Sequence, residues 1–380
     1  ASTVSCVWSI MQTAAALSLN WPSAYVGLLC SFLVALVIVA TKKWHGRLTL
    51  DVPQGIQKFH TIPTPRIGGI ALAVGLIAAW SFLPVGSNRQ HLLGLLLLGA
   101  LPAFAFGLAE DITKRISVKA RLLATIASGL VAALLTGYWV SFVNVPGLDL
   151  LLALAPIGIV FTAFAVGGIA NSVNIVDGFN GLAGGVVVLM LLTLATIAWR
   201  VDDFVIIQLA LLGVSVTLGF LFVNYPKGYL FLGDAGAYFL GYYVAMLAVM
   251  LAMRNPVDVS PWAMLLVCGY PVTETLFSVY RRTTRKRRHN PGTPDASHLH
   301  SLVYRRVVSR KLLPYAPAWQ RNAATSPLMW IYAAVPMLGA VFWPESLGMV
   351  LAWLIFSVVA YVRLYRRMLV LGIFFRRQSN

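Results

Sequence analysis

The chain has 380 residues, of which 59% are apolar and only 11% charged, and its formal net charge is +17. A soluble domain carries about a quarter charged residues, so this composition excludes a soluble protein and predicts an integral membrane protein. The cysteines, Cys6, Cys30 and Cys268, are too few and too scattered for a disulfide framework or a zinc site. No stretch is polar enough for a separate soluble domain, so residues 1–380 are expected to form a single membrane domain.

Apolar runs of the length that crosses a bilayer as a helix recur along the chain. No Lys or Arg precedes Lys42, so the charged start of a secretory signal is missing, and residues 1–20 are interpreted as a weakly apolar lead-in. We predict an all-α polytopic protein with about eleven transmembrane helices. The predicted spans are residues 23–41, 67–84, 91–109, 121–140, 150–170, 182–199, 204–223, 236–253, 260–279, 327–344 and 346–363.

Lys and Arg are distributed unevenly over the predicted loops. With the N-terminus outside, every one of the 29 falls on the inner side except Arg89, Arg200 and Arg254. Positive charge accumulates in cytoplasmic loops, so we expect a periplasmic N-terminus and a cytoplasmic C-terminus. The net positive charge then reflects the membrane topology. No nucleic-acid partner is expected, because the Lys and Arg side chains lie along one face of the membrane, beside the lipid.

The carboxylates also follow a pattern relative to the predicted membrane. Half of the twelve fall on the predicted inner side, each at a helix end or in a short loop. Acids gathered at one membrane face indicate a functional site there. These residues are Asp51, Glu110, Asp111, Asp177, Asp234 and Asp295.

An acidic pair, Glu110 and Asp111, ends the third predicted span in the motif GLAEDITKRISVKARL. Adjacent carboxylates repel each other, and beside bases such as Lys119 they can serve together as metal ligand and general base. The alternative is a solvated helix end that is neutralised by its own lysines.

A second motif, NSVNIVDGFNGLAGG, places Asn171, Asn174, Asp177 and Asn180 at a spacing of three. Residues three apart share one face of a helix, so we expect these polar groups to converge, and the glycines allow close approach of a ligand. The alternative is an ordinary capped turn, which Asn, Asp and Gly also form.

A third motif, NYPKGYLFLGDAGAYFLGY, contains Asn224, Phe231 and Asp234. Asp234 lies at the start of the eighth predicted span, where a helix N-terminus attracts phosphates. One or two carboxylates together with substrate phosphates are the usual way to hold Mg²⁺. Alternatively, Asp234 is a plain N-cap.

Basic groups complete the inner face. The first inner loop supplies Lys58 and His60 in the motif DVPQGIQKFHTIPTPRIGG, and the cytoplasmic basic loop 280–326 supplies His298 and His300. Histidines two apart are weak evidence for zinc, so contact with anionic oxygens is the better interpretation.

Glu274 lies about two turns inside the ninth predicted span, where an intramembrane carboxylate is a functional candidate by default. A structural pairing with a base from the neighbouring loop is the alternative. The sequence does not decide between the two.

Taken in order, these motifs resemble those of the polyprenyl-phosphate N-acetylhexosamine-1-phosphate transferases. The pattern is D-x-P…K-x-H-x-x-P-T-P-R-x-G-G, an acidic pair, N-x-x-N-x-x-D-G-x-N-G-L, F-x-G-D-x-G and a basic loop with H-x-H. The resemblance is strongest to the undecaprenyl-phosphate N-acetylglucosamine-1-phosphate transferases that start O-antigen and related glycans. The peptidoglycan enzyme phospho-N-acetylmuramoyl-pentapeptide transferase is more distant.

The resemblance implies an enzyme of the bacterial inner membrane with its active site on the cytoplasmic face. Such an enzyme transfers an N-acetylhexosamine 1-phosphate from a UDP-sugar to undecaprenyl phosphate and releases UMP. The implied cofactor is Mg²⁺, with Mn²⁺ as a substitute, and a homodimer is left open.

The resemblance also assigns roles by position. Asp234 and Asn174 are expected at the metal. The catalytic set is Glu110, Asp111, Asp177, Asp234, His298 and His300. The substrate-binding set is Lys58, His60, Lys119, Asn171, Asn174, Asn180, Asn224 and Phe231.

Some positions depart from the family pattern. The acidic pair is usually Asp-Asp, but Glu110 comes first here, and Gln57 stands where an Arg usually precedes the Lys. Ala296 replaces an Arg of the last loop, and Asn180 stands where some relatives have Asp. These last two differences bear on which sugar is accepted.

Two other classes of protein are weighed against the enzyme. A transporter with a coupling-ion path would place charges near the bilayer midplane and show repeated halves. No repeat is visible, and the acids lie at one face. A lipid-binding scaffold without catalysis would not need a metal-type aspartate and paired acids together.

Overall fold

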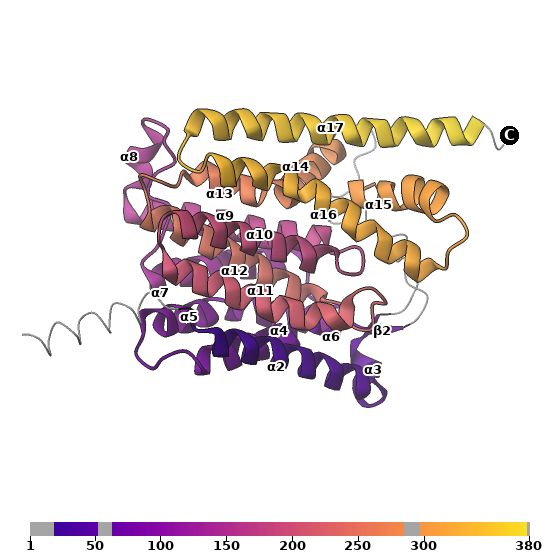
Figure 1. Cartoon of the computed structure of the whole chain (residues 1–380), viewed down its shortest axis with the longest axis horizontal. Helices are drawn as coiled ribbons and strands as arrows, with labels where there is room; N and C mark the ends of the chain where they lie inside the picture. Colours follow the sequence, from indigo (N-terminus) through magenta and orange to yellow (C-terminus); the bar gives the residue numbers. More distant parts are fainter. Residues whose placement is uncertain (1–18, 52–62, 285–296, 378–380) are drawn as a thin grey trace, which may run out of the picture.

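The structure is a computed structural model that describes residues 19–51, 63–284 and 297–377 (Figure 1). These residues are mostly helical, with one short antiparallel pair of strands, β1 (Leu50–Asp51) and β2 (Thr64–Pro65). Long apolar runs fold this way because a backbone inside lipid must satisfy its hydrogen bonds within each segment. The predicted class of an all-α, multi-pass membrane protein is confirmed.

The helices follow one another with short connections. Eight are long and apolar enough to cross a membrane, or up to ten if each of two bent pairs is one span. The predicted number of spans and the orientation of the termini stay predictions. The helices are α2 (Trp21–Ala40), α3 (Lys42–Thr49), α4 (Gly68–Ser81), α5 (Asn88–Gly99), α6 (Leu101–Thr113), α7 (Val118–Thr136), α8 (Leu148–Leu152), α9 (Ala155–Val176), α10 (Leu182–Arg200), α11 (Phe204–Asn224), α12 (Gly233–Arg254), α13 (Pro261–Val267), α14 (Gly269–Thr284), α15 (Leu299–Val303), the π-helix η1 (Tyr304–Leu312), α16 (Ala318–Phe342) and α17 (Leu347–Arg377).

Two of the predicted spans are broken in the structure. The predicted span 91–109 is divided between α5 and α6, which meet at 46°, and the span 260–279 between α13 and α14, which meet at 79°. Pro102 and Pro271 lie in the first turn after each break, where the missing N–H of proline suits the start of a new helix.

The predicted cytoplasmic basic loop 280–326 contains helices in its described part, and its position relative to a membrane stays a prediction. Residues 299–312 form α15 and η1, and α16 begins at Ala318 instead of near residue 327. These turns are rich in Arg, Lys and other polar residues, so an apolar-run criterion excludes them although they are helical.

Helix α12 lies in the middle of the bundle, while α2 and α17 lie at its opposite edges (Figure 1). Every residue of α12 from Gly233 to Ala252 is buried. The helices α4, α6, α9, α10 and α11 all pack against it. Side chains from these surrounding helices can therefore come together at the N-terminus of α12.

Glycines set how closely α4 and α6 approach α12. A Cβ on Gly69 would lie 2.5 Å from the Gly236 nitrogen, and one on Gly107 would lie 2.6 Å from the Ala235 Cα. Neither position has room for a side chain, so the helices pack backbone against backbone. This contact brings Asp111, one turn beyond Gly107, to the start of α12.

Gly107→Ala is expected to lower the free energy of unfolding by about 1–3 kcal/mol, because the added methyl collides with the α12 backbone. The measurement is unfolding of the detergent-purified variant. The matched control is Gly168→Ala in α9, where an added Cβ meets nothing within 4 Å and a small gain is expected. Equal effects of the two substitutions would contradict this packing.

Candidate active site

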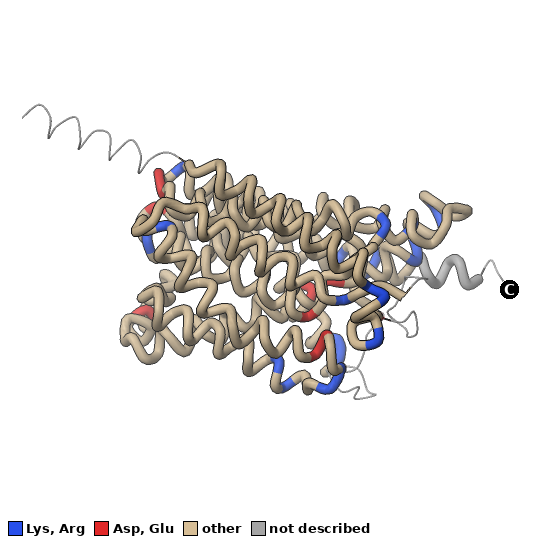
Figure 2. The backbone as a smooth tube through the Cα atoms, turned by 90° about the horizontal axis from the view of Figure 1, so that it is seen from below, with Lys and Arg blue, Asp and Glu red and all other residues tan. Residues whose placement is uncertain are grey.

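Lys and Arg are distributed unevenly between the two ends of the helix bundle. Figure 2 shows most of the Lys and Arg at the end where the C-terminus lies, and only a few at the opposite end. Helix α12 begins at the basic end, beside β2. The Gly68 and Gly69 amides, at the start of α4, donate hydrogen bonds to the Phe231 and Leu232 carbonyls just before α12.

Asp111 holds the first turn of α12. Its Oδ1 accepts a hydrogen bond from the Asp234 amide at 2.8 Å, and its Oδ2 accepts one from the Ala235 amide at 2.9 Å. Arg66 Nε lies 3.4 Å from the same carboxylate, which is fully buried. Gly233, with φ +76°, leaves room for it, since a Cβ there would lie 2.5 Å from Asp111 Oδ2.

This geometry corrects two alternatives drawn from the sequence. Asp111 is not a solvated helix end, because its cation comes from Arg66 on a distant segment and not from its own lysines. Asp234 is not the N-cap of α12, because the helix begins at Gly233 and Asp111 accepts the free amides. The side chain of Asp234 is thereby left for other partners.

Asp234 is the centre of the cluster. Its Oδ1 accepts hydrogen bonds from the Arg66 guanidinium and from Asn174 Nδ2, the latter at 3.1 Å, and its Oδ2 accepts one from Arg121. The carboxylate is almost completely buried. The two residues predicted at the metal, Asp234 and Asn174, are thus in direct contact, and their role at a metal stays a prediction.

The sequence reasoning gave no role to Arg66 and Arg121, although both lie in the motifs that it used. Burial lowers the pKa of the Arg66 guanidinium, but the combined attraction of nearby carboxylates, chiefly Asp234 and Asp111, outweighs it and raises the pKa above its ordinary value. The feature of the sequence that could have pointed to these two arginines is the need to balance buried negative charge. Two buried carboxylates need cationic partners, and these arginines stand at the starts of the predicted spans 67–84 and 121–140.

Asp177 lies at the C-cap of α9, one turn beyond Asn174, and is half-buried. Burial raises the pKa of its carboxyl to about 7, while Arg66 lowers it and Asp234 raises it further. These interactions place Asp177 within electrostatic reach of the cluster around Asp234.

The two histidines lie against this same turn. His298 Nδ1 is 2.9 Å from Glu274 Oε1, and the Leu299 amide donates to both carboxylate oxygens of Glu274. The rings of His298 and His300 stack with centroids 5.3 Å apart, and a Cβ on Gly178 would lie 2.9 Å from His300 Nε2. Glu274 therefore pairs with a base from the following segment and fixes the histidine pair beside the turn at Asp177.

The expectation that four polar groups converge on one helix face is wrong. Helix α9 ends at Val176, so the spacing of three continues into a turn. The Asn171 side chain donates to Thr125 Oγ1 and to the Gly167 carbonyl, both at 2.8 Å, and so joins α9 to α7. Only Asn174 and Asp177 remain directed at the cluster.

Asn180 and Asn224 brace the chain instead of facing the cluster. Asn180 Nδ2 donates to the Pro226 carbonyl at 3.0 Å. Asn224 accepts from the Gly181 amide at 2.6 Å and donates to the Leu230 carbonyl at 2.7 Å. Their side-chain groups are used within the protein, so the geometry gives no support to their predicted substrate contacts.

Of the remaining predicted residues, the structure describes Glu110, Lys119 and Phe231. Glu110 is half-buried and accepts a hydrogen bond from the Ile116 amide at 2.8 Å, which closes the turn between α6 and α7. Lys119 is exposed, and Phe231 is half-buried in the segment before α12. Outside the described residues lie Lys58, His60 and Asp295.

Among the described residues, no group of three or more His, Cys, Asp or Glu is placed to hold a metal ion. A magnesium ion that also binds substrate phosphates needs only one or two protein carboxylates. The oxygens of Asp234 and Asn174 are hard donors of the kind that Mg²⁺ and Mn²⁺ prefer. The residues present therefore fit a cation that is completed by substrate.

Comparisons with known proteins show which family this chain resembles. A family model described as glycosyl transferase family 4 matches residues 93–252. A probable undecaprenyl-phosphate N-acetylglucosaminyl 1-phosphate transferase of Bacillus subtilis is 30% identical over 251 residues, 66% of this chain and 68% of the relative. The undecaprenyl-phosphate alpha-N-acetylglucosaminyl 1-phosphate transferase of Escherichia coli K12 is 27% identical over 67% of this chain and 69% of its own. The phospho-N-acetylmuramoyl-pentapeptide-transferase of Enterococcus hirae is 27% identical over 60% and 73%.

The helical fold and the relatives together define a membrane-embedded phospho-sugar transferase. The chain belongs to glycosyl transferase family 4. The resemblance inferred from the motifs is confirmed, and the transporter alternative gains no support.

Asp111→Asn is expected to cost about 2–4 kcal/mol of stability, because the amide presents N–H groups to the α12 amides and leaves Arg66 less compensated. Thermal unfolding and the folded yield in detergent measure this. Glu110→Gln is the control, since its side-chain oxygen can still accept from Ile116. Wild-type stability of Asp111→Asn would show that the cap is unimportant.

Proposed function

We propose that the protein transfers an N-acetylhexosamine 1-phosphate from a UDP-sugar to undecaprenyl phosphate, giving undecaprenyl-diphosphate-sugar and UMP. The observation that carries the proposal is the buried Asp234, held with Asn174 between Arg66 and Arg121 at the basic end of the bundle. The names of the relatives supply the lipid acceptor and the sugar.

The position of the cluster suits two unlike substrates. One substrate is a lipid and the other a soluble nucleotide, so their phosphates can meet only at a membrane face. The side chain of Arg66 is 30% exposed, and a partly exposed guanidinium can hold phosphate oxygens in a two-pronged contact. By the distribution of Lys and Arg, this face is the cytoplasmic one in a bacterial inner membrane.

The proposed reaction exchanges one phosphorus–oxygen bond for another. An oxygen of the lipid phosphate attacks the β-phosphorus of the UDP-sugar, and the bond from that phosphorus to the bridging oxygen breaks. UMP leaves with the electron pair. Arg66 and Arg121 neutralise the approaching phosphates and orient them, which is the main catalytic requirement of phosphoryl transfer.

Mg²⁺, or Mn²⁺ in its place, would be held by Asp234 and Asn174 and would supply positive charge beside the leaving UMP. The Asp111 carboxylate keeps Asp234 in place through α12, and Asp177 with His298 and His300 forms the adjoining wall. In a cell this reaction would be the first membrane step of O-antigen or related glycan synthesis.

The direct test combines purified protein, Mg²⁺, undecaprenyl phosphate and a panel of labelled UDP-sugars, beginning with UDP-GlcNAc. Released UMP and labelled lipid are measured together. The proposal predicts that both appear in equal amounts. A transporter or a non-catalytic scaffold would form no labelled lipid with any sugar, and that result would refute the proposal.

Asp234→Asn is expected to lower the transfer rate by about a thousandfold or more, since charge stabilisation worth several kcal/mol is removed from the transition state. Chelation of divalent cations should stop the wild-type reaction, and added Mg²⁺ or Mn²⁺ should restore it. The control is Asp258→Asn, an exposed carboxylate in the loop that follows the far end of α12. Near-normal transfer by Asp234→Asn would contradict the assignment.

A further inference from the structure

A stripe of polar side chains runs along one face of α16, which packs against α10. Asn322, Ser326 and Trp330 follow one another at a spacing of four, so their side chains lie above one another on the helix. Asn322 and Ser326 are buried, and Trp330 is half-buried. Buried polar groups need hydrogen-bond partners, and these three side chains find theirs at residues 177–181, the α9–α10 turn.

Each member of the stripe binds the backbone of this turn. Asn322 Oδ1 accepts a hydrogen bond from the Asn180 amide at 2.8 Å, and Ser326 Oγ donates one to the Asn180 carbonyl at 2.6 Å. Trp330 Nε1 donates to the Gly181 carbonyl at 3.2 Å. Both backbone polar groups of Asn180 are thus bound by side chains of α16, so this helix helps to set where the turn lies.

The segment that leads to Asp234 holds the same turn from another side. Asn224 Oδ1 accepts from the Gly181 amide at 2.6 Å. The next residue, Tyr225, packs against Trp330 with ring centroids 5.3 Å apart. The stripe on α16, the α9–α10 turn and the segment before α12 therefore form one connected unit.

The turn also contacts the segment that carries the histidine pair. A Cβ on Gly178 would lie 2.9 Å from His300 Nε2. The ring centroid of Phe179 lies 5.7 Å from that of His300 and 5.2 Å from that of Tyr304. Asp177 directly precedes Gly178, so any movement of the turn away from α16 would also change the position of the Asp177 carboxylate relative to the histidines.

We propose that Asn322, Ser326 and Trp330 are positioning residues, which hold the Asp177 carboxylate beside His300 for the transfer reaction. The inference rests on the proposed function and assigns to α16 the placement of one wall of its site. A wall that supports phosphoryl transfer must be held in a narrow range of geometries. Here that geometry depends on side chains from a separate helix, because the turn receives few bonds from regular secondary structure.

Ser326→Ala removes one bond between the stripe and the turn without adding volume. With labelled UDP-GlcNAc and undecaprenyl phosphate, we expect the kcat to fall about tenfold, because the Asp177 carboxylate is no longer held in place. In the Asp177→Asn background the same substitution should lower the remaining kcat less than about twofold, because the hydroxyl acts through that carboxylate.

Hydrogen exchange of the backbone amides measures the position of the turn without any reaction. In the detergent-purified protein, Ser326→Ala should speed exchange in peptides that cover the α9–α10 turn about tenfold. Trp330→Phe keeps a ring and loses only the N–H donor, and it should have the same effect if Ser326→Ala does not fold.

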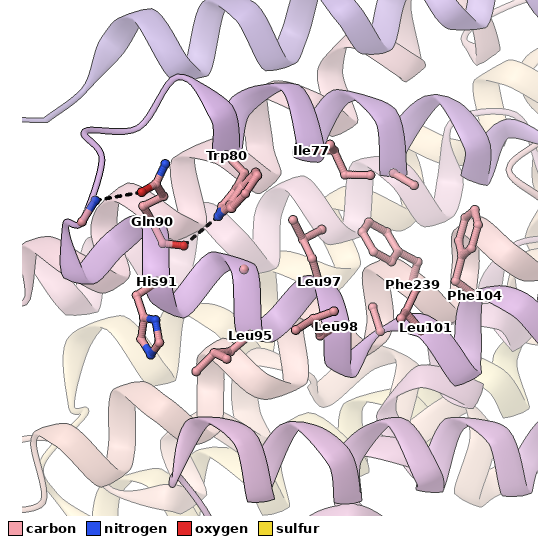
Figure 3. Close-up of a pocket in the computed structure, with 14 residues that line it drawn as sticks. Ile77, Trp80, Gln90, His91, Leu95, Leu97, Leu98, Leu101, Phe104 and Phe239 are labelled. Carbon is pink, nitrogen blue, oxygen red and sulfur yellow. Dashed lines mark hydrogen bonds between the residues drawn. The ribbon is translucent and has the colours of Figure 1, made fainter.

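The matched control is Thr325→Val, on the same helix. Thr325 is as deeply buried as Ser326, but its hydroxyl donates to the Arg321 carbonyl of α16 itself, at 3.0 Å. A second control is Leu97→Ala. Leu97 lines an apolar pocket between α4, α5 and α6 (Figure 3), and none of the described lining residues belongs to α10, α16 or the turn. Both controls should leave the kcat of the folded protein and exchange in the turn at wild-type values.

Three results would overturn the inference. Unchanged exchange in the turn would show that the stripe does not hold it. Losses of kcat as large in the two controls would indicate a general effect of stability. An undiminished loss in the Asp177→Asn background would show that the stripe does not act through Asp177. Failure of the proposed function is a different result, because the wild-type protein would then form no labelled lipid, whatever the exchange in the turn.

Discussion

The contact on which the rest of the structure depends is the capping of α12 by Asp111. The first amides of a helix have no partner within it, and inside a membrane protein an unsatisfied amide is costly. Both oxygens of Asp111 satisfy these amides from a separate helix. Because α12 is buried along its length and its start is fixed in this way, the position of Asp234 is fixed as well.

Charge balance follows from that constraint. Two buried carboxylates side by side would repel, and the cost is offset by Arg66 and Arg121, which approach from separate segments. Such a cluster adds little to the stability of the fold, since apolar packing would stabilise it as well. The cluster is well suited to bind phosphates, because the guanidinium groups can exchange a carboxylate partner for a phosphate oxygen.

Much of this protein is predictable from its sequence, for physical reasons that also set the limit. Composition and apolar runs define the membrane class, because lipid tolerates few charges. The order of the motifs indicates the family, and the spacing of Asn174 and Asp177 indicates a site at one helix end. What the sequence does not give is which partner each polar group finds. Asp111 bonds to an amide more than a hundred residues away, and Asn171 and Asn224 turn to neighbouring backbone.

The most direct measurement of the central claim is a double-mutant cycle between Arg121 and Asp234. The free energy of unfolding is measured for Arg121→Gln, for Asp234→Asn and for the double variant. A direct buried ion pair predicts strong coupling, on the order of 1–3 kcal/mol. If the two single effects instead add to within about 0.5 kcal/mol, the two groups do not share a buried site, and the account of the cluster is contradicted.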